Sequence, residues 1–287
     1  MNSNFPEYIG HKIKNDGFFL SNDIASMIPE DVLQELYICQ PVDKDPINTE
    51  ETAHHKASVI KYHVLTEGTN SFLNVNALDE NSELEDGLDD HFASKLAVWL
   101  YQSLNLEDIY NFQILIVDEL HYAVLEAKDK IKNETDMRIQ CIFSKDIFWH
   151  QDSCKYIPNE YLLFMIIDQR NIYPDVSLEI ALGKVEQSEN ESAKKASVIA
   201  DNSEIRTPSI SGSGYIIDET WENDDGYGIV HKRSKLRMGI CNFDGYVDVY
   251  DDPKYSFLKD CIININKSDE IPIRKKLIVR MWKDTSS

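Results

Sequence analysis

The pattern of hydrophobic and polar positions divides the chain into two parts in which apolar residues recur with different periodicity. In the first part, apolar residues recur every three or four positions, which predicts helices over 22–39, 92–104 and 114–131. Between the first two of these, the alternating segment 54–65 predicts a strand. The sequence therefore predicts that the N-terminal part, residues 1–135, is mostly helical.

From about residue 136 onward, short segments rich in β-branched and aromatic residues alternate with turns. These segments predict strands over 137–143, 161–167, 176–182, 214–217, 236–243, 246–250 and 276–282. The polar stretch 187–204 contains few aromatic residues and predicts a mobile insertion.

No clear linker is visible, so residues 1–287 are expected to form one domain of the α+β class. Its expected core is a double-stranded β-helix (a cupin-like jelly roll) over 136–283, with the helices of the N-terminal half packed outside.

Composition and charge narrow the classes of function. The 287 residues are 42% hydrophobic and carry a net charge of −21, which argues against nucleic acid or an anionic membrane as a partner. The sequence contains no apolar run of about eighteen residues and no basic-then-apolar N-terminal signal. Its five cysteines are scattered without a C-x-x-C pair, which favours a reducing, cytoplasmic setting.

The candidate chemistry begins in the segment FWHQDSC, which contains His150 and Asp152. In a strand, residues two positions apart project from the same face, so this imidazole and this carboxylate would point to one site. They supply two thirds of the facial triad that binds non-haem Fe(II) and leaves positions open for other ligands. A lone H-x-D motif occurs often by chance. His231, the only histidine on the C-terminal side of Asp152, follows a predicted strand and turn and is the candidate third ligand.

Two arginines and two tyrosines are candidates for binding other molecules at this site. Arg274 and Arg280 share a face of the last predicted strand, and an arginine fork suits the carboxylate of an oxo-acid co-substrate. Each arginine is equally compatible with a surface charge. Tyr161 is a candidate for binding the co-substrate and Tyr156 for binding the substrate, although both also suit core positions.

Together these residues resemble the 2-oxoglutarate/Fe(II)-dependent dioxygenases, in particular the bacterial amino-acid hydroxylase group that includes L-isoleucine dioxygenase. The resemblance rests on HQDS at 150–153, the apolar strand YLLFMII, the interval from Asn171 to Ser177, the distal His231 and the final strand RKKLIV. It covers roughly the C-terminal half of the chain. Ser153 stands where the family pattern has glycine.

The resemblance implies that the three candidate ligands hold Fe(II) and that 2-oxoglutarate chelates the metal, with its far carboxylate paired to Arg274 or Arg280. It implies hydroxylation of a C–H bond of a small molecule, such as a free amino acid, with release of succinate and CO2. Asn171 falls in the segment expected to bind substrate. Two alternatives stay open: the same chemistry on a protein side chain, and a non-catalytic jelly-roll binding module in which His150 and His231 are structural.

Other clusters of ionisable residues are less compatible with a metal site. The adjacent His54 and His55 point to opposite faces of a strand, and the sequence DELH at 118–121 lacks the helical spacing of zinc proteases. His91 follows an acidic run and is expected to begin a helix. The sequence also contains no phosphate-binding loop, dinucleotide fingerprint or G-x-S-x-G elbow.

Overall fold

The computed structural model describes most of the chain. It covers residues 5–39, 58–67, 71–77, 91–118, 138–140, 149–153, 159–170, 177–186, 194–233, 239–242, 245–248 and 273–284. The helices are α1 (Phe5–Asp16), the short 3-10 helix η1 (Ala25–Met27), α2 (Glu30–Ile38) and α3 (Phe92–Ser103). None of the helices in these ranges combines the length and the apolar character that crossing a membrane requires.

The strands of the described residues form three sheets. They are β1 (Phe18–Ser21), β2 (Ser58–Glu67), β3 (Ser71–Ala77), β4 (Tyr110–Asp118), β5 (Arg138–Gln140), β6 (His150–Gln151), β7 (Tyr161–Arg170), β8 (Ser177–Glu186), β9 (Lys194–Ile199), β10 (Ile205–Pro208), β11 (Gly214–Asp218), β12 (Gly228–Arg233), β13 (Gly239–Asn242), β14 (Gly245–Asp248) and β15 (Ile273–Lys283).

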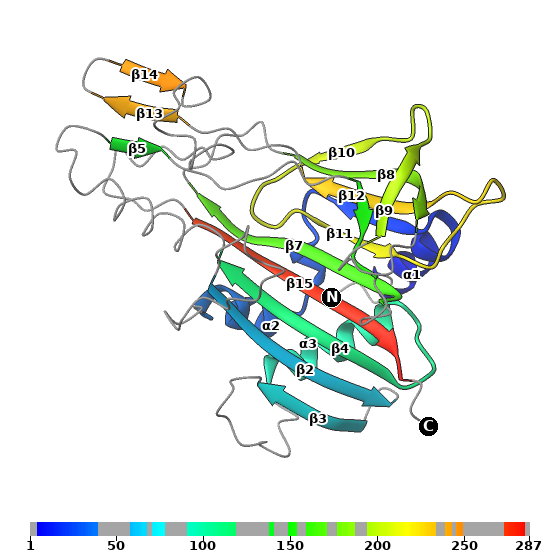
Figure 1. Cartoon of the computed structure of the whole chain (residues 1–287). Coiled ribbons are helices and arrows are strands. Elements are labelled where there is room, and N and C mark those ends of the chain that lie inside the picture. Colours follow the sequence, from blue (N-terminus) through cyan, green and yellow to red (C-terminus); the bar gives the residue numbers. More distant parts are fainter. Residues whose placement is uncertain are drawn as a thin grey trace.

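The fold is built mainly from two large antiparallel sheets (Figure 1). A seven-stranded sheet has the order β1-β11-β7-β15-β4-β2-β3, and a five-stranded sheet has the order β10-β8-β12-β6-β9. Along the chain, β4, β7, β11 and β15 belong to the first sheet, while β6, β8, β10 and β12 fall between them and belong to the second. This alternation is the topology of a double-stranded β-helix, so the predicted fold class is confirmed.

The seven-stranded sheet separates two apolar cores because side chains alternate between its faces. On β7, Leu163 and Met165 join the larger core, which also contains buried residues of all three α-helices. Leu162 and Phe164 point the other way, into the space between the two sheets. This second core lies between the two sheets, inside the jelly roll. The candidate site lies next to it, because Tyr215 of this core contacts His231.

The structure corrects the prediction that residues 1–135 are mostly helical. The helix predicted over 92–104 is confirmed as α3, but the one predicted over 22–39 is divided into η1 and α2, with Ile28 in an extended conformation between them. The helix predicted over 114–131 is wrong, because its first part continues β4 and residues 119–137 lie outside the described ranges. In this half of the chain, β1, β2, β3 and β4 all join the seven-stranded sheet.

The polar stretch 187–204 also differs from its prediction. Where a mobile insertion was expected, β9 pairs with both β8 and β6. Ala200 and Ser203 then hydrogen bond to Leu182 of β8, so the stretch from 194 to 204 is attached to the second sheet. Residues 187–193 lie outside the described ranges.

The packing of α3 against the sheet can be tested by removing one buried side chain. Leu96 is completely buried in the helix-side core, so Leu96→Ala should lower the free energy of unfolding by about 2–5 kcal/mol. Ile38, at the end of α2, is 69% exposed, and Ile38→Ala should change it by less than about 0.5 kcal/mol. Urea unfolding of both variants measures the difference, and equal effects would contradict the described packing.

Candidate metal centre

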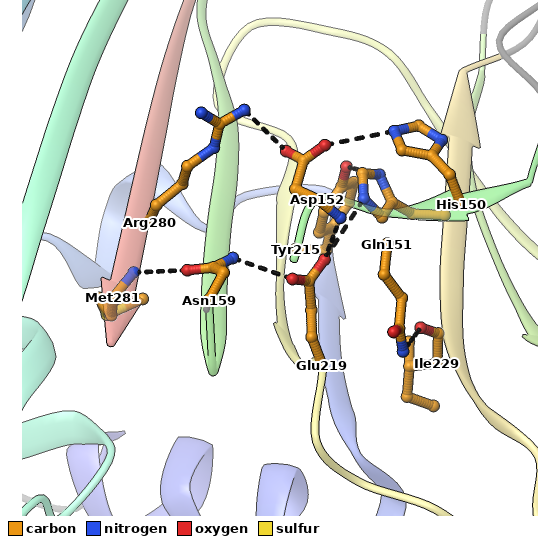
Figure 2. Close-up of polar contacts among 10 residues, drawn as sticks. His150, Gln151, Asp152, Asn159, Tyr215, Glu219, Ile229, Arg280 and Met281 are labelled. Carbon is orange, nitrogen blue, oxygen red and sulfur yellow. Dashed lines mark hydrogen bonds and ion pairs between the residues drawn. The ribbon is translucent and has the colours of Figure 1, made fainter. Parts of the chain in front are cut away.

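The three candidate ligands come together on the inward face of the five-stranded sheet. His231 of β12 lies directly opposite His150 of β6, so the two imidazoles share a face, with ring centroids 4.4 Å apart. Asp152 follows β6, and its Oδ1 lies 3.3 Å from Nε2 of His150 (Figure 2). One ligand atom from each residue lies within 4.8 Å of the other two. The convergence expected from the sequence is therefore present.

The state of His231 fits a metal ligand. Its Nδ1 is 2.8 Å from the hydroxyl oxygen of Tyr215. Its Nε2 is buried, has no hydrogen-bond partner among the described residues, and lies 3.8 Å from Oε1 of Glu219. Burial, followed by the nearby charge of His150, lowers the pKa of His231 to about 3 despite the opposing effect of Asp152. The imidazole is therefore neutral at neutral pH, which is the form that binds metal ions.

The carboxyl group of Asp152 is held ionised. Burial by itself raises its pKa, but the Arg280 guanidinium and the hydrogen bond with His150 outweigh burial and hold the pKa well below its usual range. Nη2 of Arg280 lies 3.6 Å from Oδ2 of Asp152. Two imidazoles and one carboxylate form the donor set expected for Fe(II) in a site that leaves positions open.

Arg280 points inward from β15 toward Asp152 (Figure 2). Its Nη1 lies 3.4 Å from the side-chain oxygen of the buried Gln113, and its Nε is buried without a hydrogen-bond partner among the described residues. Because its contacts are long and one donor is unused, the guanidinium retains donors for an anionic ligand.

The remaining cations of β15 lie farther along the strand. Arg274 lies opposite Gln169 of β7, and its side chain is outside the described residues. Lys276 lies on the same face as Arg280, with Nζ 5.7 Å from the centre of the Phe164 ring. It was not among the candidate site residues in the sequence. The sequence KKLIVR could have shown this position, because residues of a strand alternate between faces. With Leu277 on the helix side, Lys276 lies on the opposite face.

Two polar residues that were not candidates in the sequence form hydrogen bonds next to Asp152 (Figure 2). Oε1 of Glu219 accepts a hydrogen bond from the backbone N–H of Asp152 at 2.6 Å, and Oε2 accepts one from Nδ2 of Asn159 at 3.0 Å. Burial, followed by the charge of Asp152, raises the pKa of Glu219 to about 8. In sequence, Glu219 lies in the acidic segment DETWENDD, which resembles a solvated turn.

The structure does not bring every candidate residue into the site. Tyr161 packs against the helix-side core, with its ring centroid 6.3 Å from that of Tyr110, and therefore faces away from the three candidate ligands. Tyr156 and Asn171 lie outside the described residues, so their proposed roles stay predictions.

The other histidine and acidic candidates have separate outcomes. His91 caps α3, and its Nδ1 accepts a hydrogen bond from the backbone N–H of Ala93 at 3.1 Å, which confirms the predicted helix start. Asp118 ends β4 instead of lying on a helix. His54 and His55 are outside the described residues.

Several solved structures align with this chain at low sequence identity. A bsmA homolog from Methylobium petroleophilum PM1 aligns with a TM-score of 0.50 and 8% identity over 97% of this chain and 93% of that one. IDO from Bacillus thuringiensis gives a TM-score of 0.44 and 10% identity over 99% and 97% of the two chains. The non-heme alpha ketoglutarate dependent epimerase SnoN from nogalamycin biosynthesis gives 0.40 and 8% over 98% and 87%.

At these identities the first likeness shows a shared fold and not a shared reaction, and the two lower TM-scores carry no argument. No protein-family model and no curated protein sequence matches the chain.

The contact between Tyr215 and His231 should contribute to metal binding. Tyr215→Phe removes the hydroxyl that orients the imidazole, and this should weaken binding of Fe(II) or Co(II) by about 10- to 100-fold without unfolding the protein. The half-buried Tyr227, whose ring contacts Lys184, provides the matched control Tyr227→Phe. Anaerobic metal titration measures both, and equal affinities in the two variants would contradict the proposed orientation.

Proposed function

We propose that this chain is an Fe(II)- and 2-oxoglutarate-dependent dioxygenase that hydroxylates a C–H bond of a small molecule. The observation that carries the proposal is the convergence of His150, Asp152 and His231 inside a jelly roll, with the buried Nε2 of His231 making no hydrogen bond among the described residues. A binding module with structural histidines would not require three ligand atoms to converge.

Each residue of the site has a distinct task in this proposal. His150, Asp152 and His231 would hold the metal through two neutral imidazoles and one carboxylate. When bound, iron and 2-oxoglutarate supply the oxidising chemistry, in which dioxygen provides the hydroxyl oxygen and the oxo acid leaves as succinate and CO2. Tyr215 orients one imidazole, and the apolar residues of the second core limit the access of water.

Arg280 is proposed to bind a carboxylate of the oxo acid. Its guanidinium lies beside Asp152 and has a buried Nε without a partner among the described residues, so a carboxylate would satisfy a donor that is otherwise unpaired. Arg274 and Lys276 lie farther along the same strand. A free amino acid is proposed as the first class of substrate to test.

The proposed function is tested by anaerobic titration of the apo-protein with Fe(II) and 2-oxoglutarate. We expect the visible charge-transfer band of the chelate in the wild type and its loss in His150→Ala, because that variant lacks one of the three ligands. The exposed His11 of α1 provides the control His11→Ala, which should retain the band. A folded wild-type protein without the band would overturn the dioxygenase proposal and favour a binding module.

Succinate release then identifies the substrate class. Free amino acids should stimulate succinate release above the level measured with 2-oxoglutarate alone, and mass spectrometry of the product should show the addition of one oxygen atom. Stimulation by peptides but not by free amino acids would replace the small-molecule substrate with a protein side chain.

The role of Arg280 predicts a selective defect in co-substrate binding. Arg280→Gln removes the charge-assisted hydrogen bonds, so the 2-oxoglutarate concentration at half-maximal band intensity should rise about 10- to 100-fold. Arg206, which is 61% exposed and pairs with Glu204, provides the control Arg206→Gln. Unchanged 2-oxoglutarate binding in Arg280→Gln would move the role to Arg274 or Lys276.

A further inference from the structure

A buried hydrogen-bonded relay connects the metal-binding carboxylate to the strand that carries Arg280. Glu219 follows β11, and its side chain is 0% exposed. It accepts one hydrogen bond from the backbone of Asp152 and another from Asn159, the residue that precedes β7 by two positions. Asn159 in turn accepts a hydrogen bond from the backbone N–H of Met281, at 2.8 Å.

The backbone around the relay is bonded in the same order. The N–H of Glu219 donates to the carbonyl of Glu160 at 2.7 Å, and the N–H of Glu160 donates to the carbonyl of Met281 at 2.8 Å. The relay therefore joins three separate parts of the chain, and Met281 is adjacent to Arg280. A buried carboxyl group is costly unless hydrogen bonds satisfy it, and Glu219 therefore does not belong to a solvated turn.

We propose that Glu219 and Asn159 are positioning residues that hold the backbone of Asp152 so that its carboxylate faces both the metal and Arg280. This inference rests on the proposed metal-dependent function. Neither residue is a ligand in the proposal: Glu219 acts through the Asp152 backbone, and Asn159 acts by fixing Glu219 and Met281 relative to each other.

The direction of each hydrogen bond gives the proposal a sharp test. Both oxygens of Glu219 accept, whereas Asn159 donates with Nδ2 and accepts with Oδ1. In Glu219→Gln, the new amide N–H2 meets Nδ2 of Asn159, so two donors face each other. If Asn159 flips to relieve this contact, its amide N–H2 faces the N–H of Met281 instead. The single variant keeps the shape of the site but cannot satisfy the relay.

A second substitution restores the pattern without restoring the original residues. In Glu219→Gln/Asn159→Asp, one oxygen of the new carboxylate accepts from the Gln amide, and the other accepts from the N–H of Met281. The Gln oxygen still accepts from the backbone of Asp152. All three hydrogen bonds of the relay are then possible, with the carboxyl group moved to position 159.

The experiment measures binding of Co(II) alone to the full-length apo-protein, using the visible absorption of the bound ion. Glu219→Gln should raise the Kd by about 10- to 100-fold and change the Co(II) spectrum, and the double variant should return both close to wild type. Glu222→Gln, an exposed neighbour in the same turn, should match wild type. If Glu219→Gln is not recovered folded, Asn159→Leu is the alternative single variant, because it removes both side-chain hydrogen bonds of Asn159 and should also weaken binding.

Two results would overturn the proposal: Co(II) binding by the single variant that equals wild type, or a double variant as weak as the single variant. Because Co(II) binding requires neither 2-oxoglutarate nor turnover, this test is separate from the test of the proposed function. A wild-type Co(II) site that depends on His150 but gives no band with Fe(II) and 2-oxoglutarate would remove the dioxygenase proposal alone. A wild type without a His150-dependent Co(II) site would overturn both.

Discussion

The site depends on the antiparallel register that places His231 directly opposite His150. Because side chains alternate along a strand, a slip of one residue would turn an imidazole away from the interior. The two-residue β6 supplies little of this register. Six residues of β12 pair with β8, from Gly228↔Gly183 to Arg233↔Leu178, and these pairs fix the position of His231. Gly183 also allows close packing there, since a Cβ would lie 2.9 Å from a methyl group of Val230.

The charges of the site follow from this arrangement. Asp152 is paired with Arg280, whereas Glu219 is buried close behind it and has a raised pKa. Two carboxylates in one poorly solvated region repel each other, and Arg280 contacts Asp152, so the charge of Asp152 raises the pKa of Glu219. His231 stays neutral because protonation would place another positive charge beside His150 and Arg280 in a buried position. The site therefore combines an ionised carboxylate with a neutral imidazole, which is the protonation state that metal binding requires.

The sequence predicted the convergence of the three candidate ligands better than the elements around them, for physical reasons. The two-residue period of a strand brought His150 and Asp152 together, and only one histidine followed them. The strand β4 was predicted as a helix because both of its faces carry apolar residues, and a continuous apolar run does not distinguish the two structures. The strand β9 was not predicted because none of its residues is fully buried, so its sequence carries no clear apolar face. Glu219 could not be identified because its burial depends on contacts with Asp152 and Asn159, which are distant in sequence.

Side chains of β15 alternate between the apolar helix-side core and the site, so packing in the core holds the polar groups of the site in place. Val279 and Met281, on either side of Arg280, are completely buried in the helix-side core, whereas the guanidinium projects to the opposite face. Packing on one face therefore fixes the backbone from which the cation extends. The same backbone donates the N–H of Met281 to Asn159, so the core that stabilises the sheet also sets the relay behind Asp152. This connection allows Asp152, which follows a strand of only two residues, to keep a defined orientation.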